Sequence, residues 1–135
     1  MSMCRKHILL VDDKKDILQP LAEGLRASDT EFEVLTAENG RKALDIFRSG
    51  HRIDLLVTDL EMPVMDGFVL LAHLKRDYPA TPAIVLTGHI TPEIESLLRM
   101  IGDYHCLQKP VGIGKLHRKI LDELRLHSAH DENTG

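Results

Sequence analysis

The sequence predicts an α/β fold, a parallel five-stranded sheet with helices packed on both of its faces. Five short apolar runs alternate along the chain with five longer stretches whose apolar residues recur at helical spacing. This alternation is typical of right-handed strand–helix–strand units, in which successive strands run parallel. The 135 residues contain no internal repeat and no linker-like segment, so we expect one domain with a substantial core.

The five predicted strands are apolar and bounded by turn residues, as buried parallel strands are. They are expected at about residues 7–11, 32–37, 53–58, 83–86 and 104–107. The first apolar run, from Ile8 to Val11, is too short for a membrane span or for the apolar part of a secretion signal. We therefore expect no membrane partner.

The predicted helices follow the strands. They are expected at about residues 14–28, 40–49, 66–77, 91–101 and 113–126. In the first, Ile17, Leu21 and Leu25 share one face, while Pro20 lies inside the helix, where a proline costs about 3 kcal/mol and is expected to cause a kink. The domain is predicted to span 5–127, and 128–135 is predicted to be a disordered C-terminal tail.

The composition makes some classes of function less favoured than others. Lys and Arg number 17 and Asp and Glu 21, a net charge of −4, and the aromatic fraction is only 4%. A mildly acidic chain with few aromatic residues does not favour direct binding of nucleic acid. The two cysteines, Cys4 and Cys106, lack metal-site spacing and are too few for a disulfide framework, which favours the reducing cytoplasm.

Residues with reactive side chains follow four of the five predicted strands. Asp12 and Asp13 follow the first strand, Asp59 the third, Thr87 the fourth and Lys109 the fifth. Because parallel strands all end at the same edge of a sheet, we expect these groups to meet in one cleft.

The expected cluster has the chemistry of a phosphoryl-transfer site. Neighbouring carboxylates repel one another unless a cation neutralises them, and hard oxygen ligands suit Mg²⁺. A carboxylate can also act as a nucleophile, and phosphoryl transfer needs positioning and charge neutralisation above all. Structural roles are the alternatives: Asp12 and Asp13 could cap a helix, and Asp59 could be a turn residue.

Five motifs stand at predicted strand ends, in a fixed order along the chain. They are Val11-Asp12-Asp13, Ala37-Glu38-Asn39-Gly40, Asp59-Leu60-Glu61-Met62-Pro63 with Met65-Asp66-Gly67, Leu86-Thr87-Gly88, and Lys109-Pro110. Together they resemble the receiver domain of two-component response regulators, of the stand-alone type found in chemotaxis. The resemblance implies a flavodoxin-like doubly wound (βα)5 sandwich with strand order 2-1-3-4-5.

The resemblance also implies a role for each site residue. Asp59 would accept a phosphoryl group, and Mg²⁺ would be bound by Asp13, Asp59 and the backbone carbonyl of Glu61, with Asp12 acting largely through water. Lys109 and Thr87 would contact phosphoryl oxygens, and Thr87 would move to do so. The Lys109-Pro110 peptide bond is expected to be cis. The protein would be a phosphoacceptor that catalyses its own phosphorylation and dephosphorylation, rather than an enzyme acting on other molecules.

Partners follow from the same resemblance. The phosphoryl donor would be a sensor histidine kinase or a histidine phosphotransfer protein. The output would pass to a downstream protein through the face formed by the fourth helix, the fifth strand and the fifth helix, which could also form a homodimer.

Two features depart from the family pattern. The position that usually carries an aromatic residue coupled to the threonine is Cys106, with Tyr104 two residues earlier on the same side of the strand. Glu61 and His89 lie two residues beyond Asp59 and Thr87, at positions that tune the lifetime of the phosphoryl group in the family.

Two other functions fit parts of the pattern. A small haloacid-dehalogenase-like phosphatase also uses a strand-end aspartate, a threonine, a lysine and Mg²⁺, although it expects a second Asp where this chain has Glu61. A pseudo-receiver that binds partners without phosphate would fit the departure at Cys106.

Overall fold

The computed structural model describes residues 5–134, and their side chains as far as residue 126. Strands and helices alternate throughout, as expected. The order is β1 (Lys6–Val11), α1 (Lys15–Ser28), β2 (Phe32–Ala37), α2 (Gly40–Arg48), β3 (Leu55–Asp59), α3 (Gly67–Asp77), β4 (Ala83–Thr87), α4 (Pro92–Ile101), β5 (His105–Gln108) and α5 (Ile113–Thr134). None of the described helices is long and apolar enough to cross a bilayer.

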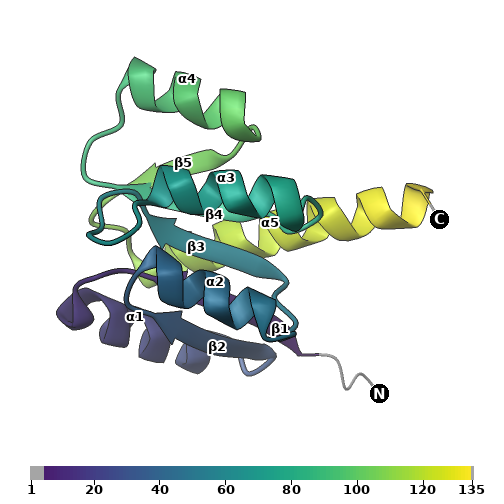
Figure 1. Ribbon diagram of the computed structural model, residues 1–135. Helices are drawn as coiled ribbons and strands as arrows, with labels where there is room; N and C mark the ends of the chain where they lie inside the picture. Colours follow the sequence, from purple (N-terminus) through teal and green to yellow (C-terminus); the bar gives the residue numbers. More distant parts are fainter. Residues whose placement is uncertain (1–4, 135) are drawn as a thin grey trace.

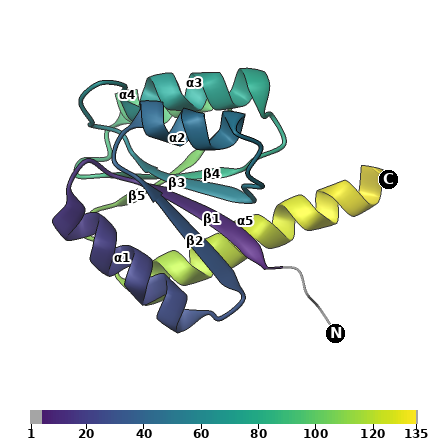
Figure 2. The ribbon, with the colours of Figure 1, turned by 60° about the horizontal axis from the view of Figure 1, so that its bottom comes forward.

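The strands form one parallel sheet in the order β2-β1-β3-β4-β5, which confirms the predicted topology (Figure 1). Helices α1 and α5 cover one face, and α2, α3 and α4 cover the other (Figure 2). The chain crosses from one face to the other around β1 and β3, which lie side by side in the middle of the sheet. Ligands of such folds bind at the carboxyl ends of the strands, where the crossover opens a crevice.

Each face of the sheet has its own apolar core. Leu9, Leu56 and Val85 pack under α2, α3 and α4, whereas Ile8, Val57 and Ile84 pack under α1 and α5. This alternation is the period-2 pattern of a strand buried on both sides, and it explains why the strands read as continuous apolar runs.

The structure corrects the predicted end of the last helix. Helix α5 continues to Thr134 and projects beyond the sheet, whereas the sequence analysis ended it at 126 (Figure 1). No glycine or proline interrupts the segment between Gly114 and Gly135, so no local signal stops the helix earlier. Disorder of the tail at 128–135 stays a prediction, although the helix occupies most of that segment.

Candidate functional site

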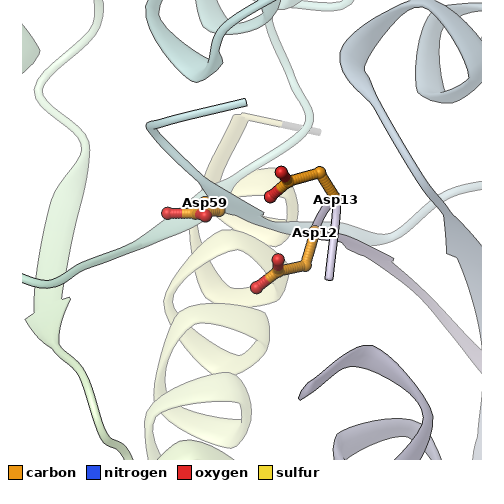
Figure 3. Close-up of side chains that lie close together, drawn as sticks. All are labelled: Asp12, Asp13 and Asp59. Atoms are coloured by element: carbon orange, nitrogen blue, oxygen red, sulfur yellow. The ribbon is translucent and has the colours of Figure 1, made fainter. Parts of the chain in front are cut away.

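The three predicted carboxylates meet at the carboxyl edge of the sheet, between β1 and β3. Asp12 and Asp13 follow β1, Asp59 ends β3, and an oxygen from each lies within 4.8 Å of the other two (Figure 3). Asp12 and Asp59 are 3% and 4% exposed, so two carboxylates of this cluster are almost fully withdrawn from water. Grouped acids at this depth require nearby positive charge.

Lys109 supplies part of that charge. Its Nζ lies 3.1 Å from Asp12 Oδ2 and 3.1 Å from Asp59 Oδ2, although Asp12 and Lys109 are far apart in the sequence. Burial lowers the pKa of Lys109, but the hydrogen bonds to both carboxylates outweigh burial and raise it. Lys109 therefore stays protonated and bridges the ends of β1 and β3. The peptide bond that follows it, Lys109-Pro110, is cis, as the resemblance implied.

The charges of the cluster are not balanced. Burial raises the pKa of Asp59, and neither Lys109 nor the backbone hydrogen bond of Glu61 cancels that effect. Asp13 Oδ1 is buried and has no hydrogen-bond partner among the described residues; the nearest ammonium, that of Lys14, lies 3.9 Å away. A cluster of three acids with an unsatisfied buried oxygen fits a hard divalent cation such as Mg²⁺.

A capping role for the first two acids does not agree with the structure. The N-cap of α1 is Lys14, and no side chain caps that helix end. Asp12 Oδ1 accepts a hydrogen bond from the backbone N–H of Lys14 at 2.9 Å, which fixes the Asp12 carboxylate in the turn after β1. The turn thus positions Asp12 and leaves Asp13 free to face the cluster.

Thr87 closes the fourth strand next to the cluster, since Leu86 pairs with Asp59 in the sheet register. It is 1% exposed. Its hydroxyl donates to the carbonyl of His89 at 3.3 Å and accepts from the N–H of His89 at 3.4 Å. Both hydrogen bonds are long, so the hydroxyl is weakly held by the loop that leads into α4.

The loop after Asp59 turns back tightly because of a glycine that the motif contains. A Cβ placed on Gly67 would collide with the carbonyl oxygen of Asp59 and lie 2.8 Å from Leu60 Cα. The N–H of Gly67 instead donates to Leu60 O at 2.8 Å, and Asp66 caps α3 by accepting from Val69 N at 3.0 Å. Gly67 is therefore a positioning residue of the site, a role that the sequence analysis did not assign.

The structure shows where Cys106 and Tyr104, the residues that depart from the family pattern, lie. Cys106 is partly buried on the face covered by α4, and it pairs with Val85 in the sheet register. The ring of Tyr104 packs over Gly102, at the C-terminal end of α4, so it lies at the end of β5 opposite to Thr87. Substitution of the usual aromatic residue by Tyr104 stays a prediction, and this placement argues against it.

A doubly wound sheet with an acidic cluster and a lysine at its crevice fits the phosphoacceptor domains of signalling proteins. The response regulator receiver domain family matches residues 8–121, which is most of the chain. The chain belongs to this family, and it is a receiver domain of the kind found in response regulators.

Individual relatives agree with this assignment. A response regulator receiver protein of Anaeromyxobacter sp. (strain Fw109-5) is 39% identical over 111 residues, 82% of this chain and 45% of that protein. The transcriptional regulatory protein GlrR of Escherichia coli (strain K12) is 36% identical over 124 residues, 92% of this chain and 27% of GlrR. The chain thus spans less than half the length of these curated relatives.

A solved structure agrees as well. The chemotaxis protein CheY4 of Vibrio cholerae superposes with a TM-score of 0.81 at 30% sequence identity, covering 87% of this chain and 98% of that one. The fold, strand order and family were therefore predicted correctly from the sequence.

Proposed function

We propose that Asp59 of this receiver domain accepts a phosphoryl group from a phosphohistidine. The observation that carries the proposal is the unbalanced cluster: three carboxylates within 4.8 Å, one lysine shared by two of them, and a buried Asp13 oxygen without a hydrogen-bond partner among the described residues. A structural ion pair would not gather more acids than it can neutralise. A phosphoryl-transfer site does, because a metal ion completes it.

Mg²⁺ is the cation that this donor set fits best. Asp13, Asp59 and the backbone carbonyl of Glu61 would bind it, with Asp12 contributing largely through water. The bound cation would supply neutralisation of charge on the cluster and on the phosphoryl oxygens.

The protein groups then have defined tasks. An Asp59 carboxylate oxygen attacks the phosphorus, a P–O bond forms, the P–N bond to the donor imidazole breaks, and the imidazole keeps the electron pair and takes up a proton. Lys109, already 3.1 Å from Asp59, stabilises the negative charge of the transferred group. Thr87 exchanges its weak bonds to His89 for a hydrogen bond to a phosphoryl oxygen.

The partners belong to the same proposal. The phosphoryl donor would be a sensor histidine kinase or a histidine phosphotransfer protein in the cytoplasm. The output partner would be a downstream protein, or a second copy of this chain, bound to the face formed by α4, β5 and α5. The domain itself is proposed to span 5–127.

Mass spectrometry after incubation with acetyl phosphate and Mg²⁺ tests the function. We expect one phosphoryl adduct that is labile to base and absent from Asp59→Asn. Rapid turnover of small phosphate esters would favour the phosphatase instead. If neither an adduct nor a beryllofluoride complex forms, the phosphate-independent binding module is the interpretation that remains.

A further inference from the structure

A groove lies beside the proposed reaction site, and most of its lining has no task in the phosphoryl transfer proposed above. It lies between the β3–α3 loop and α4, has a volume of about 390 Å³, and its apolar lining includes Met62, Pro63, Phe68 and Ile94. Thr87 also lines it. The groove and the proposed reaction site therefore share Thr87 and Glu61, and a ligand in the groove would be sensitive to the position of Thr87.

The loop at the rim of the groove exposes the apolar side chain of Val64 in a strained backbone conformation. The N–H of Met65 donates to Pro63 O at 2.8 Å, which forms a γ-turn centred on Val64 with φ 73°. This backbone conformation is unfavourable for a β-branched residue. Val64 is 80% exposed, so burial of its side chain does not offset the strain. Backbone strain that gains no packing is a feature of binding and catalytic sites.

The charges at the groove indicate the chemistry of a ligand. The charged side chains of its lining, Glu61 and Asp66, are both acidic and both exposed. Apolar walls with an acidic rim complement an apolar side chain that has basic neighbours.

We propose that this groove binds a protein segment in which an apolar side chain is flanked by Lys or Arg, with Val64 as a second apolar contact. We further propose that phosphorylation of Asp59 weakens the binding, a part that rests on the function proposed above. When Thr87 turns from His89 to the phosphoryl group, the loop that leads to Ile94 is released, and the wall of the groove formed by α4 shifts.

Titration of the ¹⁵N-labelled protein with two short peptides tests the binding. The first has a central leucine flanked by arginines and lysines, and the second has the same leucine flanked by aspartates and glutamates. We expect the basic peptide to shift the backbone amide signals of Met62, Phe68 and Ile94. No shift at these amides, or an equal shift with the acidic peptide, would overturn the proposal.

Matched variants locate the contact. Val64→Thr keeps the branched shape and its backbone strain but removes apolar surface, and Val69→Thr makes the same change on α3, at a 45% exposed position that does not line the groove. We expect Val64→Thr and Glu61→Gln each to weaken binding of the basic peptide about threefold, as loss of a methyl contact or of one exposed charge pair would. Val69→Thr should change nothing. Equal effects of Val64→Thr and Val69→Thr would contradict the assignment.

The dependence on phosphorylation is measured with beryllofluoride and Mg²⁺, using ¹⁹F signals to show that the complex has formed on Asp59. Formation of the complex with at least a threefold loss of peptide affinity supports the linkage. Formation with unchanged affinity overturns the linkage and leaves the proposed phosphoacceptor function intact. Peptide binding with no complex on Asp59 contradicts the proposed function, and the linkage with it, while supporting the groove.

Discussion

The two edges of the sheet treat charge in opposite ways. At the amino edge, His7 lies between two acids, with Nε2 2.8 Å from Glu33 Oε2 and Nδ1 3.5 Å from Asp54 Oδ2, and Asp54 also pairs with Arg52 at 3.1 Å. At the carboxyl edge, two of the three acids, Asp12 and Asp59, share the ammonium of Lys109, and the third, Asp13, lies 3.9 Å from the ammonium of Lys14.

This difference separates charges that are paired within the fold from charges of the proposed reaction site. Each of these two acids at the amino edge has a protein partner of its own: Glu33 lies against the imidazole of His7, and Asp54 accepts from the backbone N–H of His7 and pairs with Arg52. The three acids at the carboxyl edge repel one another in the absence of a cation, so this edge would gain stability on binding the proposed Mg²⁺. The comparison predicts opposite responses to mutation at the two edges.

The largest effect is expected for Lys109→Gln. Removing the ammonium leaves Asp12 and Asp59 buried without their charge partner, and we expect a loss of about 2 kcal/mol in the free energy of unfolding without Mg²⁺. Phosphorylation by acetyl phosphate should slow at every pH, because Lys109 no longer stabilises the transferred group, and the remaining reaction should weaken at a higher pH than in the wild type, because the pKa of Asp59 rises further. Urea unfolding and the pH profile of adduct formation measure the two changes. A variant as stable as the wild type would show that Lys109 does not stabilise the buried carboxylates of the carboxyl edge.

Asp13→Asn should have the opposite sign. It removes one of three crowded negative charges, and an amide can donate to a neighbouring carboxylate, so we expect stabilisation by about 1 kcal/mol in the absence of Mg²⁺. Addition of Mg²⁺ at ten times its Kd should stabilise the wild type by about 1.4 kcal/mol and the variant much less. Thermal unfolding with EDTA and with Mg²⁺ gives both values. Destabilisation of the metal-free variant would mean that the acids of this edge are structurally satisfied.

The pH dependence of stability distinguishes the edges by sign, with Asp59 at the carboxyl edge and Asp29, the C-cap of α1 just before β2, at the amino edge. Burial raises the pKa of Asp59, so this group destabilises the folded state at neutral pH, and the penalty disappears as pH falls to the pKa of an unfolded aspartate. The hydrogen bond from His117, 3.0 Å away, lowers the pKa of Asp29, so Asp29 stabilises the folded state at neutral pH and loses that effect as pH falls through its lowered pKa.

Two isosteric variants test this contrast. Asp59→Asn should be more stable than the wild type at neutral pH, and Asp29→Asn should be less stable by about 0.5 kcal/mol, since that pair is partly exposed. Both differences should vanish at acidic pH. Urea unfolding at a series of pH values is the measurement, and differences of the same sign would refute the comparison.

The smallest effect is expected at the amino edge itself. Glu33 is half-exposed beside His7, so Glu33→Gln should change the free energy of unfolding by less than about 0.5 kcal/mol and should leave the response to Mg²⁺ unchanged. A changed response to Mg²⁺ would show that the two edges are coupled through the sheet.

The sequence predicted the fold and the cluster well because both depend on simple patterns. Apolar runs ending in Asp12, Asp59 and Thr87 place reactive groups at one edge of any parallel sheet, whatever the details of packing. The sharing of Lys109 between Asp12 and Asp59 was not predictable, because it depends on where the loop after β5 places a long side chain. The role of Gly67 depends on how closely two backbone segments approach, and the γ-turn at Val64 depends on a backbone dihedral angle. Residue types alone define neither of these.

The ammonium of Lys109 and the carboxylate of Asp12 meet across a sequence separation of 97 residues. Between them the chain must complete four helices, α1 to α4, and four strands, β2 to β5, before the site exists. If Asp59 reacts as proposed, its reactivity requires the folded domain, because a nascent or partly unfolded chain contains the aspartate without Lys109 beside it. In a cell, only finished molecules of this protein would carry the signal.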